Sequence, residues 1–235
     1  MRAVNKGVNT IVYTKYENAL EDLTTRLGHY CSYCEMGVNN MIEVEHVHPV
    51  HNGGNELSWN NFLLACKYCN TVKSNNNVNR TGYFWPDIDN TDLLFDYTLN
   101  NNVLEVKTTL SNAHQAQALA LINLVGINRY PKTVNIPTKK DKRWRLRDEA
   151  IITAKNSYNN WSIVRDDTAS PYRILMAKQI AETSLIGFYS VWCKVFEGEQ
   201  TVLNEIDLIW KNRYNNYKEY HIGTTNRIIR FGGQI

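Results

Sequence analysis

Apolar residues recur at helical spacing near the start of the chain. They lie three or four positions apart, and Gly28 follows the last of them: Tyr16, Leu20, Leu23, Leu27. This period is typical of an amphipathic helix, and a glycine directly after the last apolar residue is a common helix end. The pattern therefore predicts one helix that ends at Gly28.

Two short apolar runs follow this helix. MIEVEHV (41–47) and FLLAC (62–66) predict short strands, and the Gly- and Asn-rich segment between them predicts a loop. The residues after the second run predict a short helix that frays at the asparagine run 75–77. Residues 25–80 therefore predict a strand, a loop, a second strand and a helix.

Helical patterns dominate the rest of the chain. An aromatic stretch with a turn at Pro86, YFWPDIDNTDLLFDY (83–97), is expected to be a loop. Four helical segments follow it: 110–126, capped near Ser111 or Asn112 and ended by Gly126; 141–161, with Asp141 as N-cap; one long apolar run, 170–196; and 202–214. The tail 223–235 is expected to end as a strand or a loop.

The composition narrows the class of protein. The chain has 235 residues and is 43% hydrophobic, which allows a sizeable core and argues against global disorder. No apolar run approaches the length of a membrane span, and the first residues lack the apolar core of a signal peptide. We expect a cytoplasmic protein. The net charge of +3 is too small to indicate a nucleic-acid partner by itself.

Four of the five cysteines form two C-x-x-C pairs, CSYC and CKYC: Cys31, Cys34, Cys66 and Cys69. In a cytoplasmic chain such pairs favour a tetrahedral zinc site over disulfides. The alternative is four unrelated buried thiols. The fifth, Cys193, lies in an apolar run and is expected to be a packed core residue.

Between the two cysteine pairs lies an acid–histidine pair, Glu45-His46, at the end of the first predicted strand. Asn61 precedes Cys66, and Asn70 directly follows Cys69. The segment CSYCEMGVNNMIEVEHVHPVHNGGNELSWNNFLLACKYCNTVKSN resembles the HNH endonuclease family, which has the ββα-metal (His-Me finger) fold. Asn70 stands where the family usually has histidine, so the resemblance is to an H-N-N variant.

The resemblance implies a role for each of these residues. His46 is the general base, since histidine exchanges a proton near neutral pH, and Asn61 braces the loop that orients it. Glu45 and Asn70 hold the catalytic cation, and their oxygen donors favour Mg²⁺ or Mn²⁺. His48 and His51 are expected to be loop residues without an assigned role.

Basic residues supply the expected contacts with nucleic acid. The segment KKDKRWRLR (139–147) has six basic residues in nine positions, and two lysines lie near the second cysteine pair. A nuclease needs cations that neutralise phosphates, and a solvated helix face is the alternative explanation of such a run. The expected phosphate-binding residues are Lys67, Lys73, Lys140, Arg143 and Arg147. Trp144 is expected to be the first core residue of its helix.

Together these patterns predict an α+β protein: a zinc-stabilised ββα-metal module at residues 1–80, attached to a mainly helical body at 81–235 that contacts partners and nucleic acid. Flanking segments such as RLGHYCSYCE and IGFYSVWCKVF resemble bacterial HNH nucleases of Septu and retron-associated anti-phage defence, which implies an ABC-type ATPase partner. The expected activity is metal-dependent cleavage of nucleic acid, with double-stranded DNA as the expected substrate. The alternative is a non-catalytic zinc-stabilised subunit that binds nucleic acid or a partner.

Overall fold

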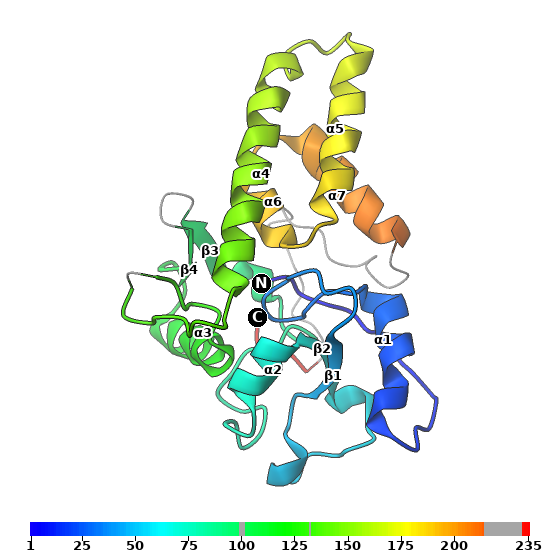
Figure 1. Cartoon of the computed structure of the whole chain (residues 1–235), viewed down its shortest axis with the longest axis vertical. Coiled ribbons are helices and arrows are strands. Elements are labelled where there is room, and N and C mark those ends of the chain that lie inside the picture. The colour runs from blue at the N-terminus through cyan, green and yellow to red at the C-terminus, as the bar shows by residue number, and fades with distance from the viewer. Residues whose placement is uncertain (99–101, 132, 214–231) are drawn as a thin grey trace.

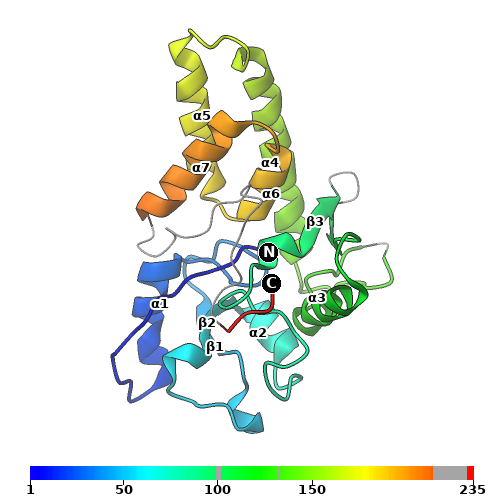
Figure 2. The same ribbon diagram turned by 180° about the vertical axis from the view of Figure 1, so that it is seen from behind.

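The computed structural model describes residues 1–98, 102–131, 133–213 and 232–235. It contains two parts that pack against each other (Figures 1 and 2). One part holds a two-stranded sheet with a helix on either side, and the other is built mainly from helices. A second two-stranded sheet and one more helix lie beside them. The α+β class expected from the sequence is confirmed.

The smaller part is centred on a strand–strand–helix unit. Strands β1 (Ile42–His46) and β2 (Phe62–Cys66) pair antiparallel, with His46 opposite Phe62 and Ile42 opposite Cys66. Helix α2 (Lys67–Lys73) follows β2 without a break. All five residues of β2 are buried because α1 covers the strand on one side and α2 on the other.

Helix α1 (Leu20–Leu27) forms where the apolar spacing predicts it, after a 3-10 turn at Tyr16–Ala19. Leu23 and Leu27 are buried, and Gly28 ends the helix with a φ of 75°. This left-handed value is easy for glycine and costly for a residue with a Cβ. The apolar face of α1 and the glycine after it were thus both predictable from the sequence.

The aromatic stretch that was expected to be a loop contains a strand of a hairpin. Strands β3 (Phe95–Thr98) and β4 (Val103–Val106) pair antiparallel. Sequence patterns missed them because each has only four residues, which is too short for an alternating pattern to stand out. Helix α3 (Asn112–Val125) packs beside β4, with Ser111 as N-cap and Gly126 as C-cap, as expected.

The body is formed by α4 (Arg143–Val164), α5 (Pro171–Ser184), α6 (Tyr189–Val195) and α7 (Gln200–Arg213). Helices α4 and α5 project together as a hairpin, and α6 and α7 lie beside it (Figures 1 and 2). The N-cap residue of α4 is Lys142, and not Asp141 as the sequence pattern predicted. The Asp141 carboxylate nevertheless accepts a hydrogen bond from the Arg143 N–H. Trp144 is half-buried and packs edge-on against Tyr130, so it is not a full core residue.

The long apolar run 170–196 is two helices, not one, and this corrects the sequence-based expectation. Gly187 (φ 115°) and Phe188 (φ 57°) separate α5 from α6. A Cβ on Gly187 would lie 2.7 Å from the backbone nitrogen of Gly37, so the two backbones meet too closely for any side chain. The break lets the first cysteine turn dock against the body.

The contact between the two parts is built around Glu35. Its carbonyl oxygen accepts the Phe188 N–H at 2.8 Å, and its carboxylate accepts the N–H and the hydroxyl of Ser190 at 2.9 and 2.6 Å. Tyr30 donates its hydroxyl hydrogen to the Leu185 carbonyl. The cysteine turn is therefore fixed to the start of α6.

Within the described ranges, no helix combines the length and apolar character needed to cross a membrane. Cys193 is buried in α6, and burial raises the pKa of its thiol. It is a core residue, as expected. The predicted strand or loop at 223–235 lies outside the described residues except for 232–235.

Candidate active site

The two C-x-x-C pairs converge on one point. The sulfur atoms of Cys31, Cys34, Cys66 and Cys69 all lie within 4.8 Å of one another, are buried, and form no disulfide. The sulfurs of Cys34 and Cys66 are 3.7 Å apart. Tetrahedral zinc with Zn–S bonds of about 2.3 Å places its sulfurs about 3.8 Å apart. The cluster is therefore consistent with a structural zinc site.

Arg143 lies beside this cluster. Its guanidinium donates to the Cys69 sulfur at 3.0 Å, to the Val125 carbonyl at 2.8 Å, and to both oxygens of Asp141. Burial alone lowers the pKa of Arg143, but the negative charge of the Cys69 sulfur and the Asp141 hydrogen bond raise it overall. Four thiolates around Zn²⁺ carry a net negative charge, and a buried cation beside them offsets it.

Glu45 lies in the core between the sheet and α2. Only 1% of it is exposed, its Oε2 accepts a 2.6 Å hydrogen bond from the Tyr33 hydroxyl, and its Oε1 lies 2.5 Å from the ammonium of Lys73. Lys73 is equally buried and also donates to the His46 carbonyl at 2.8 Å. Both oxygens of Glu45 thus have partners within the chain.

Asn70, the other predicted cation ligand, has a different partner. Its amide donates to Glu43 at 2.8 Å, and both side chains are half-buried. The structure therefore brings Asn70 to Glu43 and Glu45 to Lys73, two parallel contacts one helical turn apart. As placed, the pair Glu45 and Asn70 does not form an open cation site. The sequence did not indicate that Glu43 and Tyr33 contact the predicted cation ligands, nor that Lys73 is buried. Spacing along the sequence does not show which face of the helix meets the strand.

The Glu45–Lys73 pair is expected to stabilise the module as a unit. Lys73→Met should lower the free energy of unfolding by about 3–5 kcal/mol, because it leaves a buried carboxylate without its cation. The double variant Glu45→Gln, Lys73→Met should cost clearly less than Lys73→Met alone. Chemical denaturation of zinc-loaded protein measures both. Equal losses for the single and the double variant would contradict the pairing.

His46 lies at the end of β1, and its ring is half-buried between the edges of Tyr16 and Phe62. Its Nε2 lies 2.9 Å from the Glu56 carbonyl oxygen. A carbonyl only accepts hydrogen bonds, so Nε2 carries a hydrogen, and in the neutral ring Nδ1 then has the lone pair. This arrangement leaves one ring nitrogen able to accept a proton.

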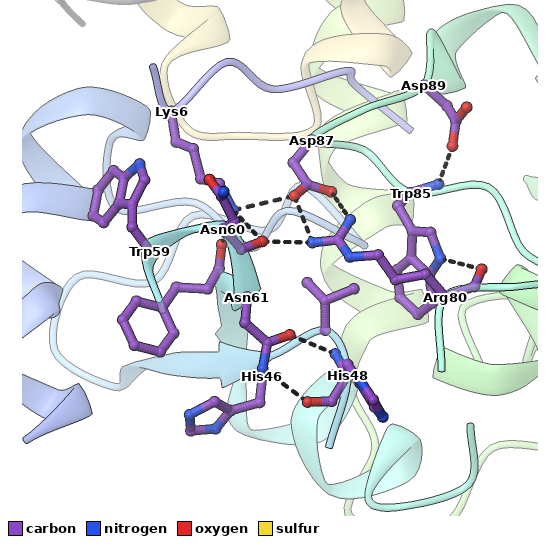
Figure 3. A network of polar contacts seen from close by, with 12 residues as sticks. Lys6, His46, His48, Trp59, Asn60, Asn61, Arg80, Trp85, Asp87 and Asp89 are labelled. Atoms are coloured by element: carbon purple, nitrogen blue, oxygen red, sulfur yellow. Dashed lines mark hydrogen bonds and ion pairs between the residues drawn. The ribbon is translucent and has the colours of Figure 1, made fainter. Parts of the chain in front are cut away.

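Asn61 connects the two ends of the loop that follows His46. Its side-chain oxygen accepts the His48 N–H at 2.8 Å, and its amide donates to the carbonyls of His48 and Asn55, both at 2.9 Å (Figure 3). Asn61 therefore has the contacts expected of a loop brace. Gly54 is required in the same loop, since a Cβ there would lie 2.0 Å from the His48 oxygen.

The other two loop histidines differ in their surroundings. The His48 ring contacts the Asn52 carbonyl at 3.0 Å, whereas His51 is exposed. His48 lies in the loop after β1, and His51 lies in the short 3-10 helix Val50–Asn52 within that segment.

The predicted nucleic-acid contacts divide into two groups. Lys67 and Lys140 are exposed, and the Tyr68 hydroxyl donates to the Lys140 carbonyl, which brings the two segments together. Lys73, Arg143 and Arg147 are buried, with partners within the chain: Glu45, Asp141 and the Ile127 carbonyl. We therefore revise the expectation that these three bind phosphates, because an enclosed cation cannot reach a ligand.

Comparison with known proteins agrees with this geometry. Residues 31–76 match the model of the HNH endonuclease family, a range that begins at Cys31 and ends just after α2. This range includes strands β1 and β2, the loop that Asn61 braces, and all four clustered cysteines. No curated protein and no solved structure matches the chain.

Proposed function

We propose that this chain, which carries an HNH endonuclease domain at residues 31–76, hydrolyses phosphodiester bonds of nucleic acid, with double-stranded DNA as substrate and His46 as the general base. The observation that supports this most directly is the His46 ring. One nitrogen is held by the Glu56 carbonyl, and in the neutral ring the other has the lone pair that a base needs. A positioned base of this kind contributes about 10²- to 10⁴-fold to a hydrolytic rate.

The proposed reaction starts with a water molecule beside Nδ1 of His46. His46 takes a proton from this water as its oxygen attacks the phosphorus, the bond to the leaving 3′ oxygen breaks, and that oxygen takes a proton from solvent water. The products carry a 5′-phosphate and a 3′-hydroxyl. Lys73 and the Asn61 brace keep the His46 main chain and the adjoining loop in place during this step.

A divalent cation, Mg²⁺ or Mn²⁺, belongs to this proposal through the family resemblance, and it supplies charge stabilisation to the phosphate when bound. Its ligands are not assigned to Glu45 and Asn70 in the present geometry. Glu45 could reach a cation only if Lys73 withdrew. The hydrogen bond from Asn70 to Glu43 uses the amide nitrogen and not the oxygen that would bind a cation.

Exposed lysines give the substrate a surface. Lys67, at the start of α2, and Lys140 lie in segments joined by Tyr68, and Lys139 and Lys142 are also exposed. We propose that these side chains bind backbone phosphates. Contacts of this kind are independent of base sequence and weaken as salt concentration rises.

The second candidate is a zinc-stabilised subunit that binds nucleic acid or a partner without catalysis. The enclosed carboxylate of Glu45 favours it, since the expected cation pair is not assembled. Incubation of the whole chain with supercoiled plasmid in Mg²⁺ or Mn²⁺, with EDTA as control, separates the two. Nicking that EDTA abolishes supports the nuclease, and plasmid retention without nicking in either metal supports the binding subunit.

The role in bacterial anti-phage defence and the ABC-type ATPase partner rest on the resemblance of the flanking segments alone. We propose that the region from Leu104 onward docks this partner, because the zinc module is engaged with the body through Glu35 and Tyr30. Co-purification with the product of a neighbouring ATPase gene tests this. The cleavage assay should be repeated with any ATPase obtained in this way, since a partner can restrain or deliver the activity.

A further inference from the structure

An ion cluster with a buried carboxylate at its centre lies beside the turn at Asn60–Phe62. Its centre is Asp87, whose side chain is 2% exposed. Arg80 contacts both carboxylate oxygens at 2.9 Å, and Lys6 contacts one of them at 3.1 Å (Figure 3). Lys6 is distant in sequence from Arg80 and Asp87, and we call the three residues the Asp87 clamp.

The cations of the clamp also hold the backbone on both sides of Asn61. The Asn60 carbonyl accepts hydrogen bonds from Arg80 at 2.7 Å and from Lys6 at 3.1 Å. The Phe62 carbonyl accepts a 2.6 Å hydrogen bond from Lys6. Figure 3 shows these residues above Asn61, whose amide points away from them toward His48. The clamp thus fixes the turn that carries Asn61.

From Asn61 the contacts continue to the histidine ring. The Asn61 amide holds the Asn55 carbonyl at 2.9 Å, and the next residue, Glu56, supplies the carbonyl that contacts His46 Nε2 at 2.9 Å. Phe62, whose carbonyl Lys6 holds, also packs its ring against that of His46. Two short routes therefore lead from the clamp to the same imidazole.

We propose that Asp87 is a positioning residue for His46, acting through Lys6 and Arg80 on the turn at Asn60–Phe62 and through Asn61 on the Glu56 carbonyl. This inference rests on the proposed function for its catalytic meaning. The charge of Asp87 is what matters, because the two cations would otherwise repel each other across the Asn60 carbonyl. An amide in its place has the same shape, but it carries no charge, and its NH2 group would replace one of the two oxygens that accept from Arg80.

The clamp stays charged over the neutral pH range. Burial alone raises the pKa of the Asp87 carboxyl, but Lys6 and Arg80 hold it well below its ordinary value. A carboxyl with a depressed pKa stabilises the fold above its unfolded-state pKa, and this contribution is lost as pH falls through the lower, folded-state value. Positioning by the clamp should therefore persist throughout the pH range in which a histidine base works.

The test compares Asp87→Asn with Glu199→Gln in the full chain, loaded with zinc. Glu199 is a suitable control because it also binds an arginine, Arg165, and a tryptophan, Trp161, but lies in the helical body away from Asn61. Asp87→Asn should lower kcat for plasmid nicking about tenfold with little change in KM, as expected for misplacement of a base. Glu199→Gln should leave kcat unchanged. Equal kcat for Asp87→Asn and the wild-type chain would overturn the proposal.

Two further measurements separate positioning from general destabilisation. In an Asn61→Ala background, Asp87→Asn should lower kcat clearly less than in the wild-type background, since the Asn61 route is already lost and only the route through Phe62 remains. Fully multiplicative effects would overturn that route. Nitrogen-15 NMR of histidine-labelled protein, with His46 assigned from His46→Ala, should show loss of the single Nε2–H tautomer in Asp87→Asn.

The NMR experiment also keeps this inference distinct from the proposed function. If the wild-type chain cleaves no nucleic acid, the proposed function fails, while the tautomer change still supports the clamp. An unchanged His46 tautomer in folded Asp87→Asn protein overturns the clamp, whatever the activity of the wild-type chain.

Discussion

Replacement of His46 by alanine is expected to lower the rate of nucleic-acid cleavage about 100-fold or more, because it removes the proposed proton acceptor. The zinc content and the fold should be retained, since the His46 ring is half-buried and lies outside the cysteine cluster, with Tyr16, Phe62 and the Glu56 carbonyl as neighbours. Single-turnover plasmid nicking, at matched protein and DNA concentrations, measures the effect.

The matched control for this variant is His29→Ala, which removes an exposed histidine at the end of α1. It should cleave at the wild-type rate. Cleavage by His46→Ala at the wild-type rate would exclude His46 as the base and direct attention to His48 and His51. Any ATPase partner should be present in both reactions, so that a restrained activity is not mistaken for a lost one.

Loss of one clustered cysteine should have the largest effect on stability. Structural zinc sites contribute apparent free energies on the order of 10 kcal/mol, which is comparable to the whole stability of a domain. Cys69→Ser should therefore yield protein without bound zinc and without cooperative unfolding of the module. The sulfur of Cys69 also faces the buried Arg143, so its loss leaves that cation without one of its partners.

Cys193→Ser is the control, because Cys193 is a buried cysteine outside the cluster. It should keep one zinc per chain and lose only the stability expected of a changed core residue. Elemental analysis and thermal unfolding followed by circular dichroism distinguish the two variants. Folded wild-type protein without zinc, or Cys69→Ser protein with a full complement of zinc, would contradict the assignment of the cluster.

The cation site is where sequence and geometry differ most. The resemblance implies that Glu45 and Asn70 act together, whereas the strand directs Glu43 and Glu45 to the same face of α2, where each meets a different side chain. A strand places alternate residues on one face, and residues three apart share a face of a helix. Which of the two carboxylates contacts Asn70 depends on the position of α2 along β1. The spacing of residues in the sequence does not determine that position.

Some features of this protein were determined by the sequence alone. The C-x-x-C pairs predict the four-sulfur cluster, because a two-residue gap brings both sulfurs of a pair to one point. The ends of α1 and α3 follow from Gly28 and Gly126. The match to the HNH endonuclease family over residues 31–76 depends on the order and spacing of residues within that segment. These signals are local, so each can be recognised without knowing where the rest of the chain lies.

Only the tertiary structure decided which charges are enclosed and which reach solvent. Arg143 and Lys67 are equally basic in sequence, yet one is buried beside Cys69 and the other is exposed. The clamp of Lys6, Arg80 and Asp87 spans more than 80 positions and has no motif. The break between α5 and α6 likewise depends on Gly37, about 150 residues away. Burial and ion pairing arise from contacts between distant segments, and the free energy of a charge depends on those contacts rather than on its neighbours in sequence.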